Sequence, residues 1–205
     1  MFYDINQVCR KHQGLVFNEQ SMVLSGTLNV DPQESDLYDV DIQFNSFPER
    51  FPKVRETGGR IPSKLDRHIN SDGTCCFTTL AKESILLKKQ IKSILDFVDK
   101  IVVPFLQNNS YYEINKSYKN GEYSHGISGV MESYFDILKI HDLSKVVYLL
   151  LKRLRNEKYG KNEICFCGSL KKIKNCHLHL YNDLFLIEKS IISNDLYLFS
   201  RALKG

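Results

Sequence analysis

Between Tyr38 and Phe44 the chain alternates strictly between apolar and polar side chains. A period of two residues predicts a β-strand with one dry face and one face turned to solvent. The dry face consists of Tyr38, Val40, Ile42 and Phe44. The chain therefore needs further strands beside this one, and an apolar layer to cover the face that they share.

Neighbouring segments supply those strands. Leu15–Phe17 and Ser21–Val30 precede the alternating segment, a turn is expected at Asp31–Ser35, and Val54 begins a last short strand. Together they predict a four-stranded antiparallel meander whose register is set by the apolar face. Before it, residues 3–13 predict a first helix.

Helical patterns follow the meander. The longest apolar stripe runs over Ser84–Leu106, and Pro104 is expected to mark its frayed end. Residues 107–123 are polar and rich in tyrosine, so we expect an exposed loop there. Three further helices are expected at residues 130–140, at 142–156 with Asp142 as N-terminal cap, and within 178–203. The order of elements predicts an α+β fold.

Composition allows one globular domain with a small appendage, because the chain has 205 residues, of which 42% are hydrophobic and 25% charged. The net charge of +4 does not by itself require a nucleic acid or an anionic membrane as partner. We find no run of about 18 apolar residues and no signal-peptide pattern, so we expect a cytoplasmic protein with no transmembrane helix and no membrane partner.

The six cysteines point to metal and thiol chemistry rather than to disulfides. Two are adjacent, three are clustered with a histidine and one stands alone, which is typical of a reducing cytosol. They are Cys9, Cys75, Cys76, Cys165, Cys167 and Cys176.

The clustered cysteines lie with His177 within thirteen residues. Zinc prefers four soft or borderline ligands in a tetrahedron, and Gly168 permits the tight turn that this requires. The string C-x-C-G-S, then lysines, then C-H, resembles the SEC-C motif, a small zinc-binding element. We predict a structural Zn2+ site with no open position, against the alternative of a reduced loop without metal. Its ligands are Cys165, Cys167, Cys176 and His177.

Nine Lys or Arg residues and two Glu fall between Lys145 and His177. Such a basic face suits a nucleic acid or an acidic protein, although a solvated face is its commoner explanation. Since the segment lacks the interleaved aromatic residues of a base-stacking surface, we expect no nucleic-acid partner.

The stretch Arg67–Phe77 carries a second candidate site, with Cys75 and Cys76 directly after a glycine and a threonine. A cysteine nucleophile needs a base, an oxyanion donor and an open site. The polar residues close enough to fold back over a thiol are His68, Asn70 and Asp72. Taken alone, the stretch fits two buried core cysteines equally well.

The run FPERFPKVRETGGRIPSKLDRHINSDGTCCF, residues 47–77, resembles the catalytic core of ubiquitin-conjugating enzymes. It is closer to their bacterial branch, whose usual form is H-x-N-x-D-G-x-x-C, and the resemblance covers about residues 1–106. It implies a ubiquitin-conjugating-enzyme-like fold, with an N-terminal helix, a four-stranded meander and C-terminal helices. It also implies Cys76 as nucleophile, Asn70 as support for the oxyanion, and His68 as the structural residue of the loop.

The chain departs from the eukaryotic pattern in this loop. Ile69 stands in place of a proline, and the spacing from His68 to Cys76 is two residues shorter. The chain also has no Trp, so the family's signature after the cysteine is missing. How the acceptor amine would lose its proton is therefore not implied.

The resemblance implies acyl transfer. Cys76 would accept the C-terminus of a ubiquitin-like protein, or another protein tail, from an activating enzyme and pass it to an amine. In bacteria such relatives occur in antiphage operons of the CBASS type, where conjugation acts on a nucleotidyltransferase that makes cyclic oligonucleotides. Cys75 is expected to be a buried neighbour, and His125 and Gly205 receive no firm role.

These observations predict a conjugating-like catalytic domain at residues 1–110, a helical extension at 111–160, and a zinc motif with a helix at 161–205. Two other hypotheses stay open. One is a catalytically inactive adaptor of the same fold that binds partners through its zinc motif. The other is a basic zinc protein that binds nucleic acid.

Overall fold

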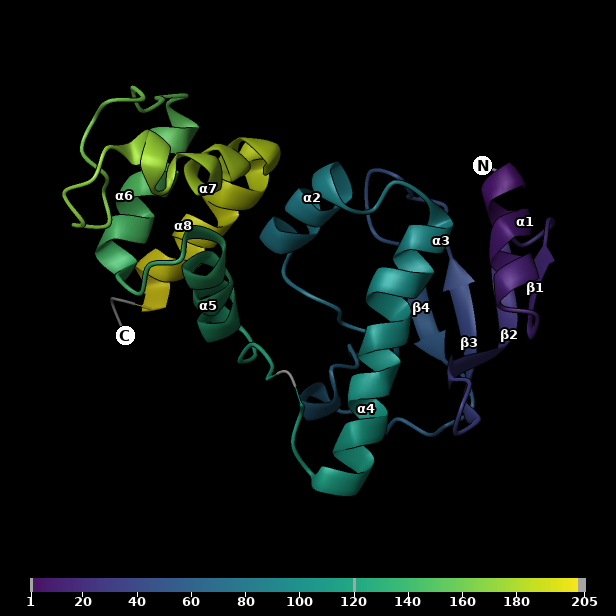
Figure 1. Ribbon diagram of the computed structural model, residues 1–205. Coiled ribbons are helices and arrows are strands. Elements are labelled where there is room, and N and C mark those ends of the chain that lie inside the picture. Colours follow the sequence, from purple (N-terminus) through teal and green to yellow (C-terminus); the bar gives the residue numbers. More distant parts are fainter. Residues whose placement is uncertain (1, 120, 203–205) are drawn as a thin grey trace. The chain divides into compact units, whose positions relative to one another are not determined.

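Four strands form one antiparallel sheet in the order in which they occur in the chain (Figure 1). They are β1 (Leu15–Asn18), β2 (Val23–Asp31), β3 (Asp36–Gln43) and β4 (Lys53–Glu56). The computed structural model describes residues 2–119 and 121–202. The predicted meander and the α+β class are thus confirmed.

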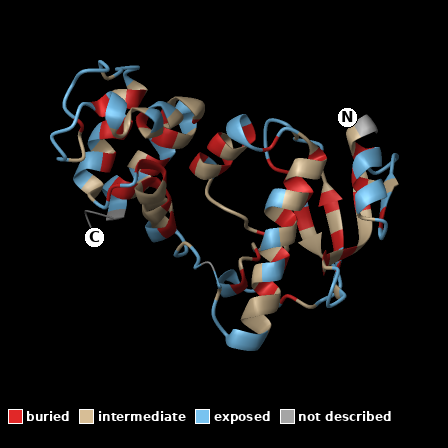
Figure 2. Cartoon of the chain, viewed as in Figure 1, coloured by how far each residue is buried: buried red, intermediate tan, exposed pale blue. Residues whose placement is uncertain are grey.

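The alternation in β3 decides which face of the sheet is dry. All four apolar residues between Tyr38 and Phe44 are buried, as the red segments of the sheet in Figure 2 indicate. Ile42 pairs with Leu24 of β2 on one side and with Val54 of β4 on the other, and none of the three side chains is exposed. One apolar row therefore crosses three strands, which fixes their register.

Helices cover this face. Helix α1 (Phe2–Lys11) packs against β1 and α3 (Ile94–Phe97), and α4 (Val103–Asn115) packs against β2. The hydroxyls of Tyr38 and Ser110 are 2.8 Å apart, so α4 lies over the dry side of β3.

The predicted single helix over Ser84–Leu106 is wrong. Helix α2 (Leu80–Lys89) ends, and a new helix starts after Ser93, whose hydroxyl accepts a hydrogen bond from the Asp96 amide at 2.9 Å. The Asp96 carboxylate in turn accepts one from the Lys92 amide at 3.0 Å. Ser-x-x-Asp is a helix-start signal of the capping-box type, and the continuous apolar stripe concealed it.

Pro104 does not end the helix either. A π-helical turn, Val98–Val102, precedes it, in which the Val103 amide bonds to the carbonyl five residues back. Pro104 then lies in the first turn of α4, where a missing N–H is tolerated. The helix continues to Asn115, so the loop expected at 107–123 is wrong up to that residue.

A second core is built from helices alone. Helices α5 (Ile127–Leu138) and α6 (Leu143–Leu154) correspond to the helices predicted at 130–140 and 142–156. Asp142 caps α6 by accepting a hydrogen bond from the Lys145 amide at 3.1 Å, as expected. Among the described helices, none is both long and apolar enough to cross a bilayer.

The helix expected within 178–203 is interrupted. Helix α7 (Leu178–Asp183) and the turn η4 (Leu184–Leu186) lead to Ile187, whose backbone is extended, and α8 (Lys189–Ala202) follows. The break lets α7 and α8 pack their apolar sides into the same core as α5 and α6. Its largest buried side chains are Tyr134, Tyr181 and Phe199.

The chain divides into two compact units. Unit 1 runs to Phe77 and resumes over Leu87–Glu122, and unit 2 comprises Thr78–Leu86 and the chain from Tyr123 onward. Unit 1 contains the sheet with α1, α3 and α4, and unit 2 contains α5 to α8 and most of α2. The boundaries predicted at residues 110 and 160 follow motifs rather than packing, and they stay predictions.

Candidate functional site

Residues His68 to Cys76 of unit 1 form a short hairpin. The Asn70 amide donates to the Thr74 carbonyl at 2.8 Å, and the Cys76 amide donates to the His68 carbonyl at 2.7 Å. The turn closes with a 2.9 Å bond from the Gly73 amide to the Asn70 carbonyl. Gly73 has a φ of 79°, a left-handed conformation that glycine adopts without steric cost. The glycine before the cysteine pair thus makes the turn of the hairpin.

The register of this hairpin separates the two adjacent cysteines. Ile69 pairs with Cys75, and both side chains are buried, at 5% and 7% exposure. Because side chains alternate along a strand, Asn70 and Cys76 lie on the opposite face from that pair. The Cys75 amide donates to the Val54 carbonyl at 2.8 Å, which holds the hairpin against edge strand β4.

Burial makes the two thiols chemically different. Desolvation raises the pKa of Cys75 to about 12, so this thiol stays protonated at neutral pH. Burial also raises the pKa of Cys76, which is nonetheless partly exposed. Cys75 is therefore the buried neighbour that the sequence predicted, and Cys76 is the accessible thiol of the pair.

Phe77 anchors the chain directly after Cys76. Its ring makes edge-to-face contacts with Phe97 and Phe105, with centroids 5.6 and 5.0 Å apart, and a third with Phe51 at 6.5 Å. Such contacts add to the burial energy of each ring. They hold the backbone at Cys76 against the helices that cover the sheet.

Asn70 is held by a chain of side-chain hydrogen bonds. Its Nδ2 donates to the Thr74 hydroxyl at 3.0 Å, and that hydroxyl donates to Asp72 Oδ1 at 2.6 Å. The bonds from the Thr74 hydroxyl and amide lower the pKa of Asp72, which stays ionised and keeps the chain intact near neutral pH. The Asn70 amide therefore has a defined orientation.

His68 connects the hairpin to the segment after α4. Its Nε2 contacts the Glu122 carboxylate, and its ring lies 5.5 Å from that of Tyr118. Tyr118 in turn donates a hydrogen bond to the Asp66 carbonyl at 3.2 Å. These contacts suit the loop-ordering role expected for His68, which stays a prediction.

Arg67 is a buried charge that the sequence did not single out. Its Nη2 donates to Asn109 Oδ1 at 2.9 Å, and its guanidinium lies 4.4 Å from the ring centre of Tyr112. Its Nε has no hydrogen-bond acceptor among the described residues. Arg67 thus fixes the start of the hairpin to α4. No sequence signal marks it, because its partners lie in a segment predicted to be mostly loop.

Unit 2 brings together the four predicted metal ligands. The ligand atoms of Cys165, Cys167, Cys176 and His177 all lie within 4.8 Å of one another. The sulfurs of Cys167 and Cys176 are 3.6 Å apart, and Cys165 Sγ is 3.4 Å from His177 Nδ1. Tetrahedral zinc bonds would place two sulfurs about 3.8 Å apart, and a sulfur and a nitrogen about 3.5 Å apart. The Cys176 and His177 atoms are closer, at 2.9 Å.

A second hairpin forms this cluster. The Cys165 amide donates to the Lys171 carbonyl at 2.9 Å, and the Ile173 amide donates to the Glu163 carbonyl at 2.8 Å. Between them Gly168 turns the chain with a φ of 86°. A short 3₁₀ turn, η3 (Ile173–Asn175), then delivers Cys176 and His177 to the two sulfurs.

The electrostatics of the cluster suit a cation. Burial raises the pKa of Cys165 to about 11. Burial also acts to raise the pKa of Cys167, but hydrogen bonds with Ser169, Cys165 and Cys176 outweigh it and lower that pKa to about 7. Burial and the nearby His179 lower the pKa of His177, so its imidazole is neutral at pH 7. Three sulfurs and a neutral imidazole fit a soft or borderline metal ion, and all four tetrahedral positions are filled by the protein.

The sequence raised two other residues without a firm role. His125 is exposed and belongs to unit 2. Gly205 lies outside the described residues.

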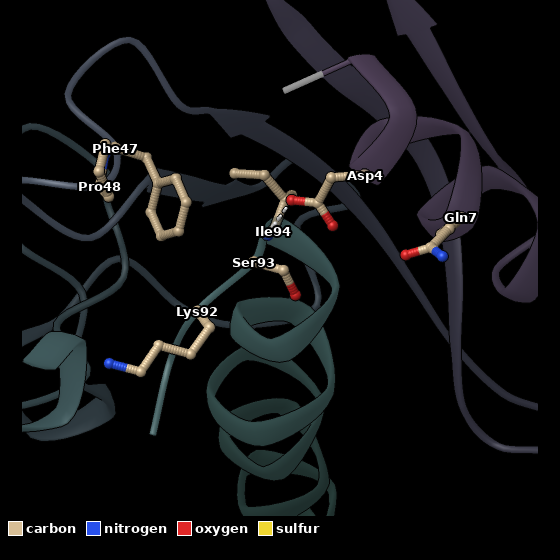
Figure 3. Close-up of a pocket in the computed structure, with 7 residues that line it drawn as sticks. All are labelled: Asp4, Gln7, Phe47, Pro48, Lys92, Ser93 and Ile94. Carbon is tan, nitrogen blue, oxygen red and sulfur yellow. Dashed lines mark hydrogen bonds between the residues drawn. The ribbon is translucent and has the colours of Figure 1, made fainter. Parts of the chain in front are cut away.

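A pocket of about 410 Å³ lies elsewhere on unit 1 (Figure 3). Within it the Asp4 carboxylate accepts a hydrogen bond from the Ile94 amide at 2.6 Å, which caps the start of α3. No predicted site residue lines it. Its lining consists of Asp4, Gln7, Phe47, Pro48, Lys92, Ser93 and Ile94.

Comparison of the chain with protein-family models, with curated proteins and with solved structures finds no match in any of the three. The two candidate sites therefore rest on the residues and geometry described above.

Proposed function

We propose that this chain is a ubiquitin-conjugating-like acyl transferase in which Cys76 carries the acyl group. The observation that carries the proposal is the hairpin register, which buries Cys75 and leaves Cys76 on a partly exposed face with Asn70. The α+β arrangement supports it. A first helix, a four-stranded meander, a cysteine loop and later helices are the order that the resemblance implies.

The proposed chemistry has two steps. The Cys76 thiolate attacks the carbonyl carbon of an incoming thioester, and the thiolate of the activating enzyme leaves. An amine then attacks the Cys76 thioester, an amide bond forms, Cys76 leaves as thiolate, and the amine proton passes to solvent. The acyl group is the C-terminus of a ubiquitin-like protein or of another protein.

The raised pKa of Cys76 suits a carrier. A thiolate of higher pKa is a more potent nucleophile and a poorer leaving group. Its thioester therefore persists longer in water, until an amine is positioned to attack it. The incoming thioester is already activated, so positioning supplies most of the rate.

Asn70 is the proposed oxyanion support. An amide nitrogen carries two hydrogens, of which Asn70 gives one to Thr74. We assign the second to the oxyanion that develops on the attacked carbonyl. His68, held by Glu122 and Tyr118, is the proposed ordering residue of the loop.

The test is intact mass spectrometry of the full chain isolated from its native host, with and without a thiol reductant. We expect an added mass that the reductant removes and that Cys76→Ala abolishes. Cys75→Ala is the matched control, because it removes the adjacent thiol and should keep the adduct. Cys76→Lys should trap the acyl group as an amide that the reductant does not cleave, so its mass identifies the modifier.

Failure to detect an adduct on any variant, with the partner genes present, would overturn the proposal in favour of the inactive adaptor. An adduct that depends on Cys75 instead would overturn the assignment of the nucleophile. The resemblance names the first acceptor to search for among the conjugates, a nucleotidyltransferase that makes cyclic oligonucleotides in bacterial antiphage defence.

The Cys165, Cys167, Cys176 and His177 cluster is proposed to hold one structural zinc ion. The donor set and the near-tetrahedral separations support zinc, and the absence of an open position among the four ligands argues against a catalytic role. Elemental analysis should find one zinc per chain, lost in Cys176→Ala and kept in Cys76→Ala.

A further inference from the structure

The metal-binding hairpin, residues 161–174, exposes two aliphatic side chains. Leu170 is 80% exposed and Ile164 is 58% exposed. Leu170 also has a φ of 58°, a left-handed conformation that is strained for a bulky residue and that glycine or asparagine adopts more easily. Both the exposed apolar surface and the strained backbone of Leu170 are unfavourable for stability. This indicates that the residue is selected for something other than stability.

Exposed lysines surround these two residues. Leu170 is followed directly by Lys171 and Lys172, and Ile164 pairs with Lys172 across the hairpin. Lys174 and Lys161 are joined by a backbone hydrogen bond at 3.3 Å, so they lie at the same end. The one acidic residue of the hairpin is Glu163, whose carboxylate accepts a hydrogen bond from the Gly160 amide at 2.6 Å.

The hairpin is a projecting tip rather than a groove. Figure 1 shows it as the light green loop between α6 and α7, and Figure 2 shows most of it, including the tip around Leu170, as exposed. Cys165 and Cys167 precede Leu170 and Cys176 follows it, so the metal cluster holds the base of the tip on both sides. A tip held in this way keeps its conformation when its apolar side chain enters another medium.

We propose that this tip docks on an anionic lipid surface, with Leu170 inserted among the acyl chains and the lysines at the phosphates. A convex aliphatic tip with a basic collar fits the apolar and charged layers of a bilayer interface. A single-stranded nucleic acid would stack its bases on exposed aromatic rings, but Phe166, the aromatic residue of the hairpin, packs on Tyr159 and His177. An acidic peptide would require a groove, which a projecting tip does not offer.

The test is co-sedimentation of the full chain, with its metal, with vesicles. Vesicles of phosphatidylcholine mixed with phosphatidylglycerol are compared with vesicles of phosphatidylcholine alone. We expect binding to the anionic vesicles only, weakened by salt. Each lysine near an anionic surface contributes about fivefold to the partition coefficient, so Lys171→Glu with Lys172→Glu should reduce it by well over tenfold.

Leu170→Asn is the decisive variant. Asparagine tolerates the left-handed conformation, so the fold and the metal content should be unchanged or improved, while vesicle binding falls about tenfold with loss of the inserted side chain. Ile114→Ala is the matched control, because Ile114 is an equally exposed aliphatic residue of unit 1, at 82%, and should not affect binding.

Three outcomes would overturn the proposal. The first is no binding of the wild-type chain to anionic vesicles. The second is vesicle binding that Leu170→Asn leaves intact, which would mean charge attraction without insertion. The third is tighter retention on heparin or an oligonucleotide than on vesicles, independent of Leu170, which would indicate a polyanion partner. None of these outcomes depends on whether Cys76 carries an acyl group.

Discussion

The hairpins of the two units share a backbone pattern but arrange their cysteines differently. In unit 1 the chain reverses at Gly73 and in unit 2 at Gly168, and each reversal is flanked by a pair of cross-strand hydrogen bonds. In unit 1 the cysteines are consecutive, so strand alternation sends Cys75 inward and Cys76 outward. In unit 2 the first two cysteines are two residues apart, and the turn brings them together with Cys176 and His177.

The spacing of the cysteines, rather than their number, therefore decides what a hairpin's thiols can do. Consecutive thiols on a strand are separated by the backbone and acquire different acidities, which suits one reactive group and one inert neighbour. Thiols two residues apart lie on the same side of the chain. The negative charges of their thiolates are then compensated only by a shared cation. Breaking either hairpin should therefore have different consequences in the two units.

Removal of the metal should produce the largest effect. With a strong chelator, or in Cys176→Ala, the cluster would lose the proposed metal ion that compensates its thiolates, and unit 2 should lose stability on the order of 5 kcal/mol. Thermal unfolding followed by circular dichroism should become biphasic, with hydrogen exchange locating the early transition in residues 160–186. Cys76→Ala under the same treatment is the control. Unchanged unfolding after proven metal loss would contradict the structural role.

Thiol labelling should show the next largest difference, within the unit 1 hairpin. At neutral pH, iodoacetamide should modify Cys76 about 100-fold faster than Cys75, because Cys75 is buried and has a pKa of about 12. Since the raised pKa of Cys76 leaves it mostly protonated at pH 7, its rate should rise about tenfold per pH unit until the pH passes that pKa. Peptide mapping of labelled protein measures both rates. Equal rates would mean that the register does not separate the thiols.

The smallest expected effect is on stability. Cys75→Ser places a hydroxyl among apolar neighbours and should cost about 2 kcal/mol, whereas Cys76→Ser should cost under about 0.5 kcal/mol. Urea unfolding at pH 7 measures both. The wild-type chain should also lose stability as the pH rises above about 8.5, where the unfolded Cys75 ionises while the folded thiol, at about 12, does not. That decline should be smaller in Cys75→Ser, which keeps only the contribution of other buried thiols such as Cys76. Similar unfolding costs for the two serine variants would contradict the separation of the two thiols.

The sequence predicts local features of this molecule well and long-range ones poorly. The Cys165 to His177 cluster and the Gly73 turn involve residues close in the chain, so spacing alone indicates them. The partners of Arg67 and His68 lie 42 and 54 residues further on, at Asn109 and Glu122. These partners belong to a segment whose composition suggested a loop. The π-helical turn that precedes Pro104 has no signature in apolar periodicity.

The division of α2 has a consequence for how the chain is made. Its first residues belong to unit 2 and its last to unit 1, so the backbone passes between the units three times. Neither unit is one uninterrupted stretch of the gene, and end-to-end fusion of two ancestral genes would not produce this interleaving. During translation, Ala81 and Ile85 emerge before the helices that bury them. The core of unit 2 therefore cannot form until the ribosome has synthesised the rest of unit 1.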